Sequence, residues 1–191
     1  RDDSTGKMQV VSGPIGKEHV HFEAPKASRL TKEMSAFIDW FNNPQDTDEV
    51  LKAGFAHLWF VTIHPFDDGN GRIARAIADM ILARSEKSSQ RFYSMSEQIR
   101  KERNSYYDIL ERTQKGTMDV TPWLIWFLGC LDRAIENAQI ILAAVLSQAR
   151  FWERIREISL NERQTNILNR LLGGFEGKLT TSKYAKLIKC S

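Results

Sequence analysis

The sequence has few of the features that mark secreted, membrane-spanning or nucleic-acid-binding proteins. It holds two cysteines among 191 residues, too few for a disulfide framework. No apolar run approaches the length that spans a membrane, and Arg1-Asp2-Asp3 does not begin a signal peptide. The formal net charge of +3 is too small to indicate nucleic-acid binding by itself. We therefore expect a cytoplasmic protein with no membrane partner.

Apolar residues are abundant and recur mostly at helical spacing. They make up 42% of the chain, which is enough to bury a core in one domain with a small appendage. Only one region alternates as strands do. The sequence therefore predicts an all-α fold, a helical bundle with one short β-hairpin.

The predicted helices are separated by short polar segments. Thr47 is expected to cap the second helix, and Thr121-Pro122 to begin a long one. The predicted helices cover residues 29–43, 47–63, 71–85, 96–112, 121–149 with a continuation over 150–158, and 161–172.

One segment carries most of the chemical information: His64-Pro65-Phe66-Asp67-Asp68-Gly69-Asn70-Gly71-Arg72-Ile73-Ala74-Arg75. Its glycines predict a turn that leads into a helix with an apolar face of Ile73, Ile77, Met80 and Ile81. Backbone amides at such a helix start carry the positive end of the dipole. Gly69 and Gly71 also lack the Cβ atoms that would hold a phosphate away, so the turn predicts an anion site.

The charged residues of this segment suit a metal-bound nucleotide. Arg72 and Arg75 project from the first helical turn and offer forked donors to phosphate oxygens. Asp68 supplies an oxygen ligand of the kind that Mg²⁺ uses when it bridges phosphates. His64 is a histidine, a residue type whose unperturbed pKa near neutrality suits it to take a proton from an attacking hydroxyl. Each residue alone is more typical of a cap, a turn or a solvated face, but the ordered set favours a functional site.

The same segment resembles the Fic signature, H-P-F-x-[D/E]-G-N-G-R-x-x-R, at every specified position. The resemblance implies a Fic-fold nucleotidyltransferase that moves AMP from ATP to a Ser, Thr or Tyr hydroxyl of a target protein and releases pyrophosphate. It implies that His64 is the general base and Asp68 the Mg²⁺ ligand. Phe66 would anchor the loop in the core.

The resemblance also assigns the residues that hold the phosphates. The main-chain amides of Gly69, Asn70 and Gly71 would form an anion cradle, and the Asn70 side chain would help to hold the α-phosphate. Arg72 and Arg75 would bind the distal phosphates. We expect phosphoryl transfer to depend chiefly on positioning and on charge stabilisation.

Two alternating runs, residues 9–12 and 19–23, flank Gly13-Pro14-Ile15-Gly16 and predict a β-hairpin over about residues 9–23. The resemblance implies that this hairpin is a flap that docks the target peptide by strand addition. His19 and His21 lie two apart on one strand; we favour a flap-surface role for them, with metal ligation as the alternative. The predicted docking residues are Gly16, Lys17, Glu18, His19, Val20 and His21.

Further residues are candidates for binding the base or supporting the loop. Tyr106 and Tyr107 are adjacent on a predicted helix, so one should face the core and the other solvent or a flat ligand. The resemblance implies that the pair walls adenine and that Gln114, where an asparagine is frequent, reaches the base; ordinary core tyrosines are an equal alternative. For His57, bracing the catalytic loop is favoured over a metal site shared with His64, because no third ligand has matching spacing.

The composition changes near the glycines of residues 173–177. We expect a Fic domain over residues 1–159, followed by a linker and the start of a helix-turn-helix, or winged-helix, domain over residues 160–191. Thr181 would cap its first helix, and Cys190-Ser191 would lie at the turn. The chain is thus expected to be the central part of a longer protein, with DNA binding open for the whole.

Fic proteins often carry an inhibitory motif, [S/T]-x-x-x-E-[G/N], which no stretch of this sequence satisfies. Glu176-Gly177 matches its end, but Leu172 stands at the hydroxyl position. We therefore expect Arg75 to be unrestrained and the chain to modify itself with ATP and Mg²⁺. The alternatives are AMP removal, transfer of another phosphate-containing group, a DNA-binding regulator and a non-catalytic nucleotide-binding adaptor. A homodimer is also left open.

Overall fold

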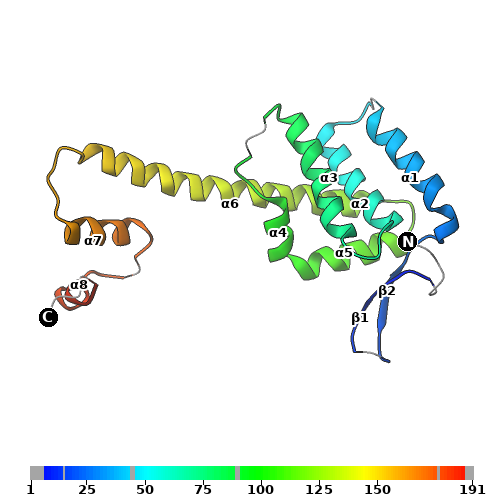
Figure 1. Ribbon diagram of the computed structural model, residues 1–191, viewed down its shortest axis with the longest axis horizontal. Coiled ribbons are helices and arrows are strands. Elements are labelled where there is room, and N and C mark those ends of the chain that lie inside the picture. The colour runs from blue at the N-terminus through cyan, green and yellow to red at the C-terminus, as the bar shows by residue number, and fades with distance from the viewer. Residues whose placement is uncertain (1–6, 15, 44–45, 89–90, 176, 188–191) are drawn as a thin grey trace. The chain divides into compact units, whose positions relative to one another are not determined.

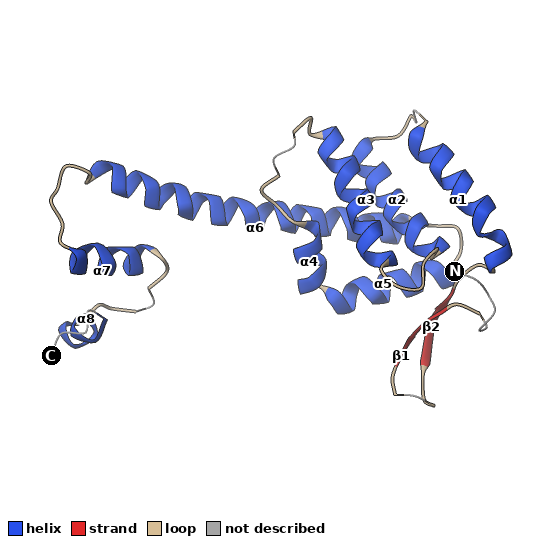
Figure 2. Ribbon diagram, in the orientation of Figure 1, coloured by secondary structure: helices blue, strands red, loops and turns tan. Residues whose placement is uncertain are grey.

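The computed structural model describes residues 7–14, 16–43, 46–88, 91–175 and 177–187 (Figure 1). These ranges contain eight helices and one antiparallel two-stranded hairpin (Figure 2), which confirms the predicted all-α class with a hairpin. No helix within them is both long enough and apolar enough to cross a membrane. The predicted turn at Cys190-Ser191 and the segment Arg1-Asp2-Asp3 lie outside the described residues.

The chain divides into two compact units, Arg1–Ala138 and Gln139–Ser191. This division falls inside a helix, whereas the domain boundary expected after residue 159 stays a prediction. The second unit contains the rest of α6, α7 (Glu162–Leu172) and α8 (Thr181–Leu187). The first unit contains β1 (Gln9–Ser12), β2 (His19–Glu23), α1 (Ala27–Asn42), α2 (Glu49–Ile63), α3 (Asn70–Ser85), α4 (Met95–Lys101), α5 (Arg103–Lys115) and residues 121–138 of α6 (Thr121–Arg154).

Helix α2 lies at the centre of the first unit and is buried along most of its length. Gly54 allows α6 to approach closely, because a Cβ atom there would lie only 3.0 Å from Leu124 Cδ2 and 3.1 Å from Phe127 Cδ1. The Trp123 indole Nε1 donates to the Gly54 carbonyl at 2.9 Å. The buried Trp123 indole and the lack of a side chain at Gly54 thus fix the contact between α2 and α6.

Helix α3 packs closely against α2. Its buried apolar residues are Ala74, Ala78, Ile81 and Leu82, and Asn70 is buried at its start. The predicted apolar face is therefore wrong at Met80, which is 41% exposed. The small side chains of Ala74 and Ala78 let the two helix backbones come together, and this row of residues, rather than the larger side chains alone, defines the packed face.

Two predicted helix caps differ from those of the structure. The cap of α2 is Asp48, whose carboxylate accepts from the amides of Val50 and Leu51, rather than Thr47. At α8 the Thr180 hydroxyl, rather than that of Thr181, accepts from an amide of the first turn, that of Lys183. The capping side chain is thus one residue later than predicted at α2 and one residue earlier at α8, where it can reach the orphan amides of the helix start.

The helix predicted over residues 96–112 is two helices, α4 and α5, which meet at Glu102. Glu102 accepts hydrogen bonds from Arg133 Nε at 2.7 Å and Arg133 Nη2 at 2.6 Å. Arg133 lies on α6, so a bidentate tertiary contact holds the residue at which the helix direction changes. The periodicity of the local sequence contains no sign of this partner.

The hairpin has the predicted strand bounds and antiparallel pairing. Val10 pairs with Phe22 and Val11 with Val20, so the register shifts between these pairs and His21 is the additional residue. Such bulges change the direction of a side chain near functional sites. Strand β2 contacts α5, which brings the hairpin beside the helix that carries Tyr106 and Tyr107.

Candidate functional site

A cavity of about 290 Å³ in the first unit is formed by the hairpin, the loop between α2 and α3, and α5. Its volume and mixed lining are typical of sites for small molecules. Its lining residues are Val10, His21, Phe22, Val61, His64, Asp67, Asp68, Gly69, Asn70, Gly71, Arg72, Arg75, Tyr106, Tyr107, Leu110, Glu111 and Gln114.

His64 lies where α2 ends, in a left-handed backbone conformation with φ 51° and ψ 56°. A residue with a side chain is uncommon there, and such outliers gather at functional sites. Its ring Nδ1 lies 3.3 Å from the Val61 carbonyl oxygen. Because a carbonyl can only accept, this contact places the proton of the neutral ring on Nδ1 and the lone pair on Nε2.

The Asn70 side chain closes the loop between His64 and α3. Its Nδ2 donates to the Phe66 carbonyl at 2.6 Å, and its Oδ1 accepts from the Phe66 amide at 3.0 Å. Asn70 is buried, whereas Phe66 is 46% exposed. The Phe66 ring lies beside the buried ring of Phe60, with centroids 6.4 Å apart, so it contacts the core but is not enclosed by it as expected. Asn70 holds the backbone of Phe66. Contact of the Asn70 side chain with an α-phosphate stays a prediction.

The start of α3 presents backbone amides to the cavity. Gly69 is the N-cap with φ 88°, a conformation that glycine adopts without strain. The first helical bond runs from the Ile73 amide to the Gly69 carbonyl at 3.0 Å, so the amides of Asn70 and Gly71 precede it. No side chain caps this helix end. The positive end of the helix therefore faces the cavity, as an anion site requires.

Asp68 and Arg72 form an exposed ion pair at the cavity edge. Arg72 Nη2 donates to Asp68 Oδ2 at 2.8 Å, and the Gly69 amide donates to Asp68 Oδ1 at 2.6 Å. The two side chains are 90% and 70% exposed, and pairs of this kind contribute little to stability. A ligand can therefore rearrange the pair at small cost. Arg75 lies one turn further along the same helix and lines the cavity.

His57 and Tyr106 form a buried contact beneath the cavity. His57 Nε2 lies 3.0 Å from the Tyr106 hydroxyl oxygen. Burial, assisted by the Arg75 charge, lowers the pKa of His57 to about 3, so the ring is neutral at physiological pH. Burial also raises the pKa of Tyr106. His57 thus contacts a side chain of α5, whereas we had expected it to brace the loop that begins at His64.

The two adjacent tyrosines lie in different environments, as predicted. Tyr106 is 3% exposed and Tyr107 is 46% exposed, yet both line the cavity. Gln114 also lines it, and its Nε2 donates to the Thr62 hydroxyl at 3.1 Å. The structure therefore brings all three residues to the site. Their contact with a nucleotide base stays a prediction.

The hairpin residues divide into two groups. Of the predicted docking residues, His21 lines the cavity. The others are exposed on the hairpin: Gly16, Lys17, Glu18, His19 and Val20. Whether they dock a peptide stays a prediction.

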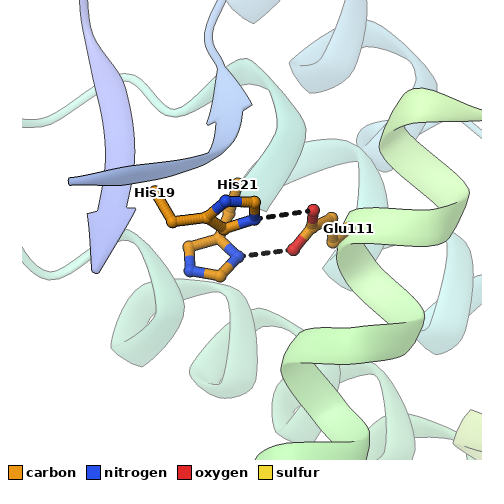
Figure 3. A group of neighbouring side chains, drawn as sticks. All are labelled: His19, His21 and Glu111. Carbon is orange, nitrogen blue, oxygen red and sulfur yellow. Dashed lines mark hydrogen bonds and ion pairs between the residues drawn. The ribbon is translucent and has the colours of Figure 1, made fainter. Parts of the chain in front are cut away.

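Glu111 is a cavity residue that the sequence analysis missed. It faces His19 and His21 (Figure 3), with Oε1 3.4 Å from His19 Nε2 and a closer contact to His21 Nδ1. Hydrogen bonds from Lys115 and then His21 lower its pKa to about 2. Its spacing from Tyr107 and Gln114, four and three residues, places all three on one helix face and could have indicated it.

Part of the chain is similar to known proteins. Residues 2–82 match the Fic/DOC family. A "Protein adenylyltransferase Fic" from Nematostella vectensis is 32% identical over 139 residues, which are 71% of this chain and 30% of the relative. Proteins of the same name from Culex quinquefasciatus and Aedes aegypti are 32% and 31% identical over 114 residues, 59% of this chain and 21% of each relative. The chain thus spans less than a third of these relatives.

Proposed function

This chain belongs to the Fic/DOC family, and from that membership we propose that it is a protein adenylyltransferase that moves AMP from ATP to a hydroxyl side chain of a protein. One observation carries the proposal. His64, the amides that begin α3 and Arg75 all line one cavity. A proton acceptor and an anion site within one cavity are what transfer of a phosphate-containing group to a hydroxyl requires.

His64 would act on the target hydroxyl. Its Nδ1 contact with Val61 leaves Nε2 as the basic nitrogen, which takes the hydroxyl proton as the oxygen attacks the α-phosphorus. The bond from the α-phosphorus to the oxygen bridging to the β-phosphate breaks, and pyrophosphate leaves with that electron pair. The target side chain is left with a phosphodiester-linked AMP.

The start of α3 would hold the phosphates. The amides of Asn70 and Gly71 face the cavity ahead of the first helical bond, and Gly69 would join them if its bond to Asp68 opened. Arg72 and Arg75 would bind the distal phosphates through their guanidinium groups. Such preorganised donors stabilise developing charge without reorganising during the reaction.

Asp68 would hold magnesium. Its carboxylate is 90% exposed at the cavity edge, and a single carboxylate with waters and phosphate oxygens is a usual Mg²⁺ environment, so the residues present fit the ion. Mg²⁺, when bound, neutralises phosphate charge. Arg72, which now pairs with Asp68, would turn from the carboxylate to a phosphate.

The remaining cavity walls would select the nucleotide base and the target. Tyr107 is exposed beside Tyr106 and offers a ring face to adenine, while Gln114 offers a polar group. The hairpin strands have open edges to which a peptide could add as a further strand, and residues 16–21 would position it. The partners of this function are ATP and a protein that presents a Ser, Thr or Tyr hydroxyl, in the cytoplasm.

The other functions considered for this sequence have less support. The relatives are named adenylyltransferases, which does not favour AMP removal or a DNA-binding regulator. A non-catalytic nucleotide-binding adaptor would need neither His64 nor Asp68, and both line the cavity. Protein adenylyl transfer gives a role to both residues, and also to the amides that begin α3 and to Arg75.

The test is label transfer from ATP that carries an isotope at its α-phosphate, with a cell lysate as the source of targets. The parent chain should label itself or lysate proteins when Mg²⁺ is present. His64→Ala should lower the rate about 10²–10⁴-fold, the range for loss of a general base, while nucleotide binding persists. Glu153→Gln, an exposed change in the second unit, is the matched control. Equal labelling by His64→Ala and the parent would reject the proposal.

A further inference from the structure

The hairpin and α5 bring three side chains with metal-binding atoms together. His19 and His21 come from β2, and Glu111 comes from α5, so residues far apart in the sequence converge (Figure 3). One ligand atom from each residue lies within 4.8 Å of the other two. We propose that His19, His21 and Glu111 bind a zinc ion that fastens the hairpin to α5. This site is separate from the proposed Mg²⁺ position at Asp68.

One of the three ligand pairs already has the spacing that a tetrahedral ion requires. Bonds of about 2.0–2.1 Å at tetrahedral angles place ligand atoms roughly 3.4 Å apart. His19 Nε2 and Glu111 Oε1 are 3.4 Å apart, and the two imidazole rings meet edge to face with centroids 4.6 Å apart. When the ion binds, its bonds to His21 Nδ1 and to Glu111 would replace the hydrogen bond between these two side chains.

Ser12 supplies the outer contact that metal-bound histidines usually have. The Ser12 hydroxyl oxygen lies 2.6 Å from His21 Nε2, the ring nitrogen that does not face Glu111. If His21 binds a metal through Nδ1, its Nε2–H donates to Ser12, which fixes the tautomer and the ring orientation. Ser12 lies on β1, so this contact spans the two strands. The bulge at His21 directs its ring toward both neighbours.

The donor set selects zinc over magnesium. Two imidazoles and one carboxylate suit Zn²⁺ or another late transition metal, whereas Mg²⁺ prefers oxygen ligands in octahedral geometry. Three protein ligands leave a fourth position for water. His21 and Glu111 also line the cavity, so the ion would lie at its hairpin wall.

Lys115 competes with a metal for Glu111. Its Nζ donates to Glu111 Oε1 at 2.6 Å and to the Val20 carbonyl at 3.2 Å. Lysine and zinc would therefore perform the same task, joining α5 to the hairpin, and one would replace the other at Oε1. Removing Lys115 should tighten zinc binding, an effect that a merely structural His–Glu contact does not predict.

The test is calorimetric titration of the chelator-treated protein with ZnCl₂. We expect one ion per chain, together with visible ligand-field bands of a tetrahedral ion when Co²⁺ is used. His19→Asn, His21→Asn and Glu111→Gln should each weaken Zn²⁺ binding at least about a hundredfold, and Ser12→Ala about tenfold. Lys115→Met should strengthen it. MgCl₂ should give no competing heat at this site.

Two control variants distinguish zinc binding at this site from the role of the loop that begins at His64. His64→Ala and Glu153→Gln should bind Zn²⁺ as the parent does, although the first is expected to lose adenylyl transfer. Melting curves without metal check that each variant is folded. Unchanged Zn²⁺ binding in His19→Asn and His21→Asn, or equally weak binding in every variant, would overturn the proposal. A zinc site that is lost only in His64→Ala would also overturn it.

Discussion

The two walls of the cavity are built in different ways. The loop wall, from His64 to Gly71, continues directly from α2 and into α3, which carry much of the buried core. The hairpin wall consists of short strands whose residues are mostly exposed, and polar side chains join it to α5. The groups proposed for the chemistry thus lie on the better-supported wall. The groups proposed for target recognition lie on the wall that can adapt.

The largest expected effect on global stability comes from removing the Asn70 side chain, which holds the loop wall. Asn70→Ala leaves the Phe66 amide and carbonyl without their partner, which should lower the free energy of unfolding by about 1–3 kcal/mol. It should also displace His64 relative to α3, and a shift of about 1 Å can cost roughly 10²-fold in rate. Denaturant unfolding and the label-transfer assay measure the two effects.

Asn70→Asp is the matched variant for this test. Its carboxylate keeps an oxygen to accept from the Phe66 amide but has no donor for the Phe66 carbonyl. It should therefore be intermediate in stability. If Asn70→Ala were as stable and as active as the parent, the loop wall would not depend on this closure, and the contrast between the walls would fail.

A smaller effect on stability is expected from His57, which is buried beneath Tyr106, and it should appear as a dependence of the unfolding free energy on pH. The pKa of His57 is about 3 in the folded protein and about 6.5 when unfolded, so between these values the unfolded state binds more protons. Stability should therefore fall as the pH falls below 6.5. Between pH 6.5 and 5.0 the loss from His57 alone should be about 1.5 kcal/mol.

His57→Gln isolates this contribution. Glutamine does not titrate, and its amide can still hydrogen-bond to the Tyr106 hydroxyl. The difference in unfolding free energy between parent and variant, followed by urea titration at several pH values, removes the contribution of the other histidines. Parallel pH profiles would show that His57 is not held neutral by burial.

The difference between the loop wall and the hairpin wall also explains which features the sequence could predict. The strand bounds and the turn into α3 follow from local signals: alternation, glycines and the apolar run of α2. The break at Glu102 was missed because its cause is Arg133 on another helix. Met80 was misplaced because Ala74 and Ala78 determine how α2 and α3 approach, and alanine carries a weak apolar signal.

Glu111 shows most directly what the sequence could not predict. Its helix face could be read from the spacing to Tyr107 and Gln114, but its partners lie on β2, about 90 residues earlier. No local pattern pairs a strand with a helix across that distance. The sequence therefore predicted the segment from His64 to Arg75 and, through the resemblance, Tyr106, Tyr107 and Gln114 as site residues. The pairing of Glu111 with the hairpin required coordinates.

The smallest expected effect on global stability comes from loosening the hairpin wall. Lys115→Met removes the bonds to Glu111 and to the Val20 carbonyl, while its apolar stem can still pack. Because these groups are exposed and β2 lies outside the buried core, the unfolding midpoint should hardly change, whereas hydrogen exchange at the hairpin amides should become faster. Exchange measured by mass spectrometry, with chelator present to exclude metals, should resolve this, and Lys115→Arg should exchange as the parent does. If Lys115→Met instead lowered the unfolding midpoint as much as Asn70→Ala, the two walls would be equally coupled to the core, and adaptable target recognition would lose its structural basis.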